Sequence, residues 1–124
     1  MTAGLTAAVI NGWLDGTFAT ANCFVQLHTA SPGAAGATAV SVGSTSRVQA
    51  TMGAASGGSK AMTSMAGTWT NGGTSETISY LSLWTAVSAG TFNASIALTT
   101  PQAWASTNTF TLNTLSVGVT PIAS

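Results

Sequence analysis

The chain has 124 residues, which is enough for one domain with a single hydrophobic core. Hydrophobic residues make up 45% of it, which excludes a disordered chain, whereas Asp, Glu, Lys and Arg together make up only 3%. Two basic residues, Arg47 and Lys60, cannot neutralise a row of phosphates, so we expect no nucleic-acid partner.

The formal net charge is zero, which removes the electrostatic repulsion that keeps molecules apart in solution. We therefore expect much of the surface to be an interface, with a biased genome composition as the alternative explanation. A lone cysteine, Cys23, allows no internal disulfide, and we expect it to be reduced and buried. The sequence contains neither an apolar run of about eighteen residues nor a basic start before its first apolar segment. These features predict no membrane span and no signal peptide, so we expect synthesis in a cytoplasm.

Residues 2–14 predict a helix, with Thr2 as its N-cap and Gly16 as the residue that ends it. We treat residues 1–16 as a docking or subunit-contact element, separate from a β-sandwich domain over residues 17–124. The residues at the spacing of one apolar helical face are Leu5, Ala8, Val9, Gly12 and Trp13.

Residues 23–29 alternate as a strand, with Cys23, Val25 and Leu27 on one face. Ser31-Pro32-Gly33 then predicts a turn, because proline presets one backbone dihedral angle and glycine supplies the next. A connection rich in Gly, Ala and Thr runs to about Ser44, and we interpret it as a long surface loop.

The rest of the chain indicates short strands between turn signals, and residues 76–85 alternate most clearly. Pro101 and Pro121 lie where we expect the sheet to need no backbone N–H for the hydrogen bonds between strands. Six to eight strands in this pattern favour a mainly β fold, an antiparallel jelly-roll-like β-sandwich with an N-terminal α-helix. The other predicted strands are residues 47–52, 60–69, 92–99, 107–113 and 115–120.

Residues for catalysis are scarce. His28 is the only conventional base, and nothing in the sequence places Asp15 or Glu76 beside it. Cys23 and His28 are five residues apart, so a regular strand points them to opposite faces. One His, one Cys and two carboxylates are too few for a metal site. We therefore predict no catalytic, cofactor-binding or metal-binding residues and no enzyme, with solvated caps as the roles of the two acids. We expect His28 on an edge strand, exposed or bonded to the following turn.

Four tryptophans in a small domain favour core or interface anchors over a sugar-binding platform. The residues that we predict to form interfaces are Leu5, Val9, Trp13, Trp69 and Trp104.

Residues 27–33, Leu-His-Thr-Ala-Ser-Pro-Gly, resemble the "LHTADPG" segment of a family of small tailed-bacteriophage virion proteins. In that family the segment follows a helix and a strand, as it does here. Ser31 stands where the family usually has Asp, so we expect a hydroxyl to cap this turn. Later blocks with the same likeness are residues 46–48, 53–60, 78–84, 88–90, 97–101 and 109–112.

Members of that family are capsid decoration, minor capsid, tail or tail-fibre proteins, so the resemblance implies a virion component made in a bacterial host. We expect a capsid decoration protein that binds the major capsid protein and copies of itself, bridging capsomers on the shell. We also expect a homo-oligomer, and a trimer would suit the local symmetry of a capsid. The alternative is a tail or tail-fibre module that binds a receptor or carbohydrate through exposed aromatics such as Trp69 or Trp104.

Overall fold

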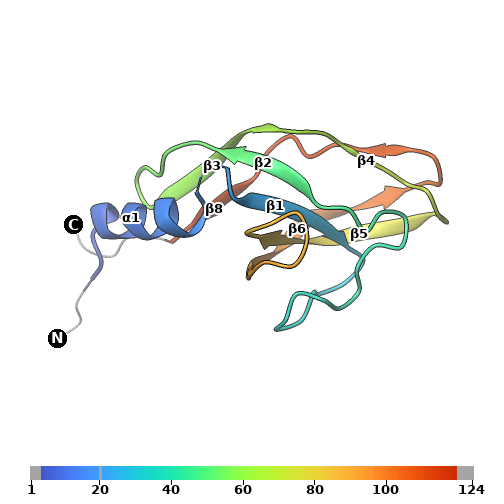
Figure 1. Cartoon of the computed structure of the whole chain (residues 1–124), viewed down its shortest axis with the longest axis horizontal. Coiled ribbons are helices and arrows are strands. Elements are labelled where there is room, and N and C mark those ends of the chain that lie inside the picture. The colour runs from blue at the N-terminus through green and yellow to red at the C-terminus, as the bar shows by residue number, and fades with distance from the viewer. Residues whose placement is uncertain (1–3, 20, 120–124) are drawn as a thin grey trace.

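The computed structural model describes residues 4–19 and 21–119, and within them the fold is one helix followed by eight antiparallel strands (Figure 1). The helix α1 comprises Ala7–Thr17. No helix in the described residues is long and apolar enough to cross a bilayer. The strands are β1 Cys23–His28, β2 Val48–Met52, β3 Ser59–Met65, β4 Trp69–Thr70, β5 Glu76–Trp84, β6 Phe92–Trp104, β7 Thr109–Phe110 and β8 Ser116–Gly118.

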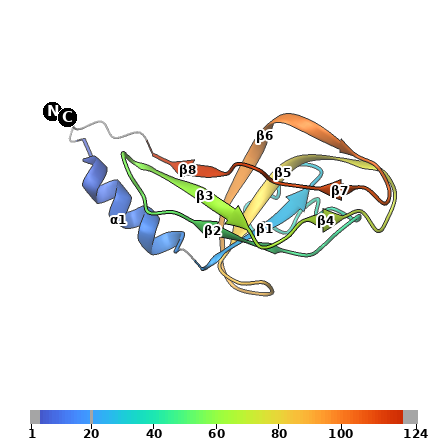
Figure 2. The ribbon, with the colours of Figure 1, turned by 90° about the horizontal axis from the view of Figure 1, so that it is seen from above.

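Six strands form one antiparallel sheet in the order β6-β5-β1-β2-β3-β8, and β4 pairs with β7 in a separate two-stranded ribbon. The sheet curls into a half-barrel, so that β2, β3 and β8 come to lie over β1, β5 and β6 (Figures 1 and 2). The predicted mainly β, antiparallel fold with an N-terminal helix is therefore confirmed. A jelly roll is not confirmed, because the larger set of strands forms one curled sheet.

The helix begins one turn later than predicted. Thr6 is its N-cap and accepts a hydrogen bond from the backbone N–H of Val9 at 3.4 Å, whereas the predicted cap, Thr2, lies outside the described residues. Gly16 does not end the helix, because the last turn closes through the N–H of Phe18 on the carbonyl of Leu14 at 2.8 Å.

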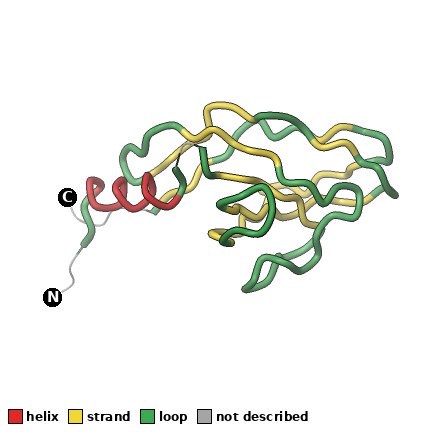
Figure 3. The backbone as a smooth tube through the Cα atoms, in the orientation of Figure 1, coloured by secondary structure: helices red, strands yellow, loops and turns green. Residues whose placement is uncertain are grey.

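The face of α1 that packs against the core is not the one that carries Leu5, Val9 and Trp13, which we predicted as a contact surface. Ile10, Leu14 and Phe18 are buried in the core. Asn11 and Asp15 lie beside them and accept hydrogen bonds from the backbone N–H groups of Gly58 and Ala55, both at 2.9 Å. These polar contacts fix the helix against the β2–β3 hairpin and turn the predicted apolar face toward solvent. Figure 3 places the helix at one end of the molecule.

The core fills the inside of the half-barrel. Cross-strand pairs such as Val25 with Leu83 and Leu27 with Leu81 supply its β1–β5 part, and all four side chains are buried. Cys23 is buried among them, as predicted.

Three aromatic rings hold the short ribbon of β4 and β7 to the core. Phe110 lies edge-on to Trp69 and to Trp104, each with ring centroids 6.0 Å apart. Trp69 and Trp104 are only 1% and 3% exposed, and their indole N–H groups donate to the carbonyls of Ser46 and Asn108. The interpretation of both tryptophans as interface residues or exposed aromatics is therefore wrong for this fold, in which they are core residues.

Strand β6 extends past the predicted end at residue 99. Its register with β5 is interrupted between Ala97 and Gln102, and Pro101 lies in that interruption on the edge of the sheet. A proline is tolerated there because an edge strand with an irregular segment needs no donor at that point. The prediction for Pro101 is confirmed, and Pro121 lies outside the described residues.

Replacing Phe110 by Ala tests the aromatic cluster. Because the ring contacts two buried tryptophans, its loss should lower the free energy of unfolding by about 3–5 kcal/mol. Chemical denaturation measures the change, with the exposed Thr111→Ala as the control. A loss below about 1 kcal/mol for Phe110→Ala would show that the ribbon does not depend on these rings.

Candidate interaction surface

Each of the four charged side chains is bound within the fold. Lys60 is buried, and its ammonium group donates to the Asp15 carboxylate at 2.7 Å, so that this pair joins α1 to β3. The hydrogen bond from Lys60, together with that from the Ala55 N–H, lowers the pKa of Asp15 below its ordinary value. Asp15 therefore links two elements and is not a cap, although its side chain is solvated as predicted, with 47% of it exposed.

Glu76 and Arg47 each hold one loop in place through hydrogen bonds, the first at residues 41–43 and the second at residues 86–89. The Glu76 carboxylate accepts the Ser41 hydroxyl and the backbone N–H groups of Val42 and Gly43, the latter two at 3.3 and 3.2 Å. The Arg47 guanidinium lies 3.7 Å from the centroid of the Trp84 ring and donates to the carbonyls of Ala86 and Ala89 at 3.0 and 2.7 Å. Neither side chain is left as an isolated surface charge.

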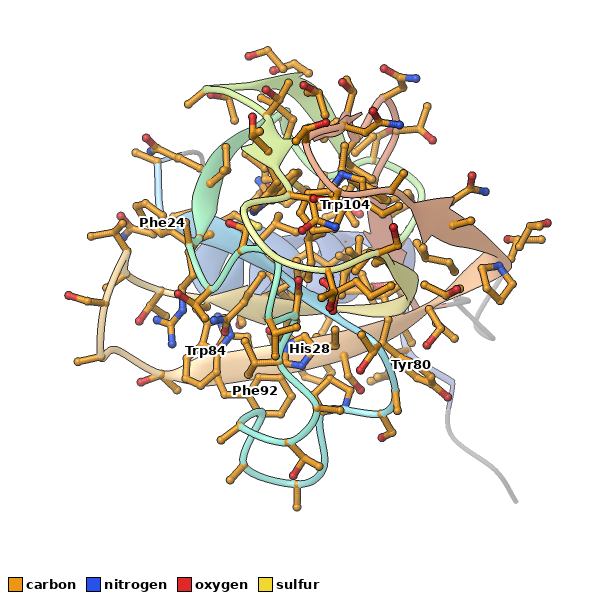
Figure 4. The ribbon with its side chains drawn as sticks, turned by 90° about the vertical axis from the view of Figure 1, so that its right-hand side faces the viewer. Phe24, His28, Tyr80, Trp84, Phe92 and Trp104 are labelled. Carbon is orange, nitrogen blue, oxygen red and sulfur yellow. The ribbon has the colours of Figure 1, made fainter. Side chains whose placement is uncertain are left out.

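His28 is buried on a central strand, so its predicted place on an edge strand is wrong. Its Nδ1–H donates to the Thr38 carbonyl at 2.9 Å, which leaves Nε2 to accept the Ser82 hydroxyl at 2.7 Å. Ser82 accepts in turn from the Trp84 indole N–H at 2.8 Å. The partner carbonyl, that of Thr38, lies in the loop after β1 but beyond the turn at residues 31–33 to which we predicted the hydrogen bond. Figure 4 labels the side chains of His28 and Trp84.

Ser82 and His28 have the hydrogen bond of a nucleophile and its base, but neither can meet a substrate. Both side chains have 0% exposure. The loop that follows β1 covers them, and Gly36, at φ +72°, packs so closely on Phe92 and Trp84 that a Cβ would lie within 3 Å of both rings. Burial also raises the pKa of Cys23 to about 11, which disfavours a reactive thiolate.

The predicted turn at Ser31-Pro32-Gly33 is displaced, because the backbone turn begins at Gly33, where the Gly36 N–H donates to the Gly33 carbonyl at 3.2 Å. Gly33 has φ +74°, and its N–H donates to the Ser31 hydroxyl at 3.4 Å, so a hydroxyl does cap this turn.

One face of α1 is exposed, uncharged and apolar, and we call it the helix stripe. Its large members are Leu5, Val9 and Trp13, which are 41%, 43% and 58% exposed. A Cβ at Gly12 or Gly16 would meet nothing within 4 Å, so no contact in the described chain requires glycine there. Glycine inside a helix costs about 1 kcal/mol relative to alanine. The two glycines therefore lower the stability of the helix and leave two positions of the stripe without a side chain. Ala8, Gly12 and Gly16 complete the stripe.

A groove of about 690 Å³ opens on the side where the half-barrel does not close, and we call it the open-side groove. It lies between β6 and residues 108–116, and every lining residue is uncharged. The apolar part of its lining includes Ile96, Leu98 and Leu112.

The sequence matches the model of a known protein family. The family model described as "Podophage GP4 fiber I protein gp80" matches residues 1–120. The chain belongs to this family. No curated protein was found to match the sequence.

Membership of the podophage fibre I family supports the predicted phage virion protein and a structural role in the virion. It agrees with the prediction that the chain is not an enzyme, since the family is described as a fibre protein. The same description does not support capsid decoration and fits the tail-fibre alternative better. The likeness of residues 27–33 to the "LHTADPG" segment is not tested by this match and stays a prediction.

Of the five predicted interface residues, the structure brings Leu5, Val9 and Trp13 together on the helix stripe. Sequence reasoning missed the open-side groove, because its walls, β6 and residues 108–116, meet only through the curl of the sheet.

Replacing Ser82 by Ala tests the buried network. It would leave the Trp84 N–H and the His28 Nε2 without their partner, so the free energy of unfolding should fall by about 2 kcal/mol. Ser95→Ala is the matched control, because Ser95 pairs with Ser82 across the sheet but is exposed. Equal stability of the two variants in urea would contradict this account of the network.

The stability of the fold should depend on the protonation of His28. Burial is the main cause that lowers its pKa below the ordinary value of 6.5, and the hydrogen bond to Thr38 opposes it. The unfolded chain therefore takes up a proton first, and the free energy of unfolding should be highest above pH 6.5 and fall as the pH drops below it. Denaturation midpoints between about pH 8 and about pH 5 measure this, since no other side chain of the sequence has its ordinary pKa in that range. Stability that stays constant or rises on acidification would contradict a lowered pKa.

Proposed function

We propose that the chain is a structural subunit of a phage tail fibre, and that the helix stripe attaches it to the neighbouring component of the virion. The family match over residues 1–120 carries the fibre assignment. The helix stripe is the observation that supports the attachment. One apolar face of α1 packs on the core of its own chain, and a second, exposed apolar face needs another partner to cover it.

The structure supports this use of α1 in two ways. Contacts from Asn11 and Asp15 hold the opposite face of the helix against the β2–β3 hairpin, so the stripe is presented on a fixed support. Trp13 is the large hydrophobic residue most exposed on this face, and a tryptophan buried at the centre of an interface is a common energetic anchor. Gly12 and Gly16 leave room beside it for close approach by a partner.

The two other functions predicted from the sequence have less support. The glycan platform was predicted on exposed aromatics such as Trp69 or Trp104, and both of these lie in the core. Capsid decoration would suit an uncharged surface as well, but the family description favours a fibre. The contact with a major capsid protein stays a prediction, and so does the trimer.

A pair of valine substitutions tests the attachment. Val9 lies on the stripe and Val87 in the β5–β6 loop, and both are exposed, so lysine should be tolerated by the fold at either site. A lysine at position 9 would become buried and unpaired in the proposed interface, so Val9→Lys should reduce the amount of the chain in purified particles at least tenfold. Val87→Lys should leave it unchanged.

Quantitative mass spectrometry of purified particles measures both variants, with circular dichroism of the isolated proteins as the check on folding. Incorporation of Val9→Lys at the wild-type level would refute attachment through the stripe. The same measurement tests the fibre assignment, since a fibre subunit should be present in a handful of copies and a decoration protein in hundreds.

A further inference from the structure

We propose that the free edge of β6 pairs with the β6 edge of a second copy of this chain, which joins two half-barrels into one continuous sheet. This pairing goes beyond the attachment through α1 and does not depend on it.

The first observation is that β6 ends the six-stranded sheet and is hydrogen bonded to β5 alone among the described strands. β6 has 13 residues, whereas β8 at the opposite edge has three. Figure 2 shows β6 along the margin of the molecule. A long edge strand presents a row of backbone N–H and C=O groups that can pair with another extended chain.

Part of this edge lacks the usual protection against pairing. Natural edge strands are protected by charged side chains, prolines or bulges. Residues 92–104 contain no charged residue, but the register with β5 shifts at Asn93 and again after Ala97, where Pro101 follows. Residues 94–97, between these two irregularities, are in regular register with β5 and leave their free edge open to pairing.

The side chains along this edge are apolar on one face of the sheet and small on the other. Ile96 pairs with Leu81 and faces the inside of the half-barrel, and Ile96 and Leu98 are only partly buried where they line the open-side groove. Ser95 and Ala97 point to the other face and are exposed. A second strand placed along this edge would thus cover an apolar row on one face and a row of small residues on the other.

A second copy of β6 fits these constraints. The groove and the edge offer no counter-charge to a charged partner, whereas this chain has a net charge of zero and an uncharged β6. Antiparallel pairing of a strand with itself is compatible with a two-fold axis, so the same patch serves both partners and the assembly closes as a dimer. A neutral oligosaccharide could bond to the hydroxyls and amides of the groove, but Trp104 and Phe110 are buried and offer no stacking face.

The mass of the isolated wild-type protein, measured by sedimentation as a function of concentration, tests the pairing first. The expected result is a dimer that dissociates to a monomer on dilution. A protein that stays monomeric at the highest concentrations overturns the proposal, and so does a monomer that binds neutral oligosaccharides in the groove. Neither result affects the fibre assignment, which is tested on particles.

Three lysine variants then locate the interface. Ala97→Lys places a charge on the free edge, where two copies would bring like charges together, and should weaken dimerisation at least tenfold. Ala61→Lys is the matched control, because Ala61 is exposed on β3, a strand with neighbours on both sides. Val9→Lys separates this interface from the helix stripe. Ala61→Lys and Val9→Lys should dimerise as the wild type does, and a dimer of Ala97→Lys with unchanged affinity overturns the proposal.

Hydrogen exchange reads the pairing directly. In the wild-type dimer the amides of residues 94–97 that face away from β5 should be protected, and in Ala97→Lys the same amides should exchange rapidly while the amides of β1 stay protected. Rapid exchange of these amides in a wild-type dimer would show that its interface lies elsewhere and would overturn the proposal.

Discussion

The fold depends on the way in which its few charges are used. Lys60 and Asp15 join the helix to the β2–β3 hairpin, and Glu76 and Arg47 fasten two loops to the sheet. Each ion thereby fixes the position of the element that it binds. The same arrangement leaves the outer surface to hydroxyls, methyl groups and backbone, which gives neighbouring molecules little electrostatic reason to stay apart.

The parts of the fold that could be predicted from the sequence are those set by local pattern. The alternation of apolar and polar residues predicted the bounds of β1 and β5 closely, and the Ser-Pro-Gly segment predicted the hydroxyl cap that Ser31 provides. The buried face of α1 could not be predicted, because apolar residues occupy two of its faces and the choice depends on contacts with Ala55 and Gly58, which are 40 and 47 residues from their partners on the helix. The strand order and the burial of Trp69 and Trp104 depend in the same way on pairings between distant segments.

The two candidate surfaces have a common physical character. The helix stripe is an apolar face on a helix that polar contacts hold in place, and the β6 edge is a row of backbone groups beside an uncharged groove. Both lack charge, so neither selects a partner by electrostatics, and each depends on shape and desolvation. A chain with one surface for a neighbour and another for its own copy is suited to building an extended structure, in agreement with its membership of a fibre family.

The arrangement of this chain in an intact particle is the most direct test of the account, and a cryo-electron microscopy reconstruction of the virion gives it. The account predicts density for the chain in a fibre, with copies paired along β6 and Trp13 buried against a neighbouring component. Single copies spread over the capsid shell, with the helix stripe and the β6 edge both facing solvent, would contradict it.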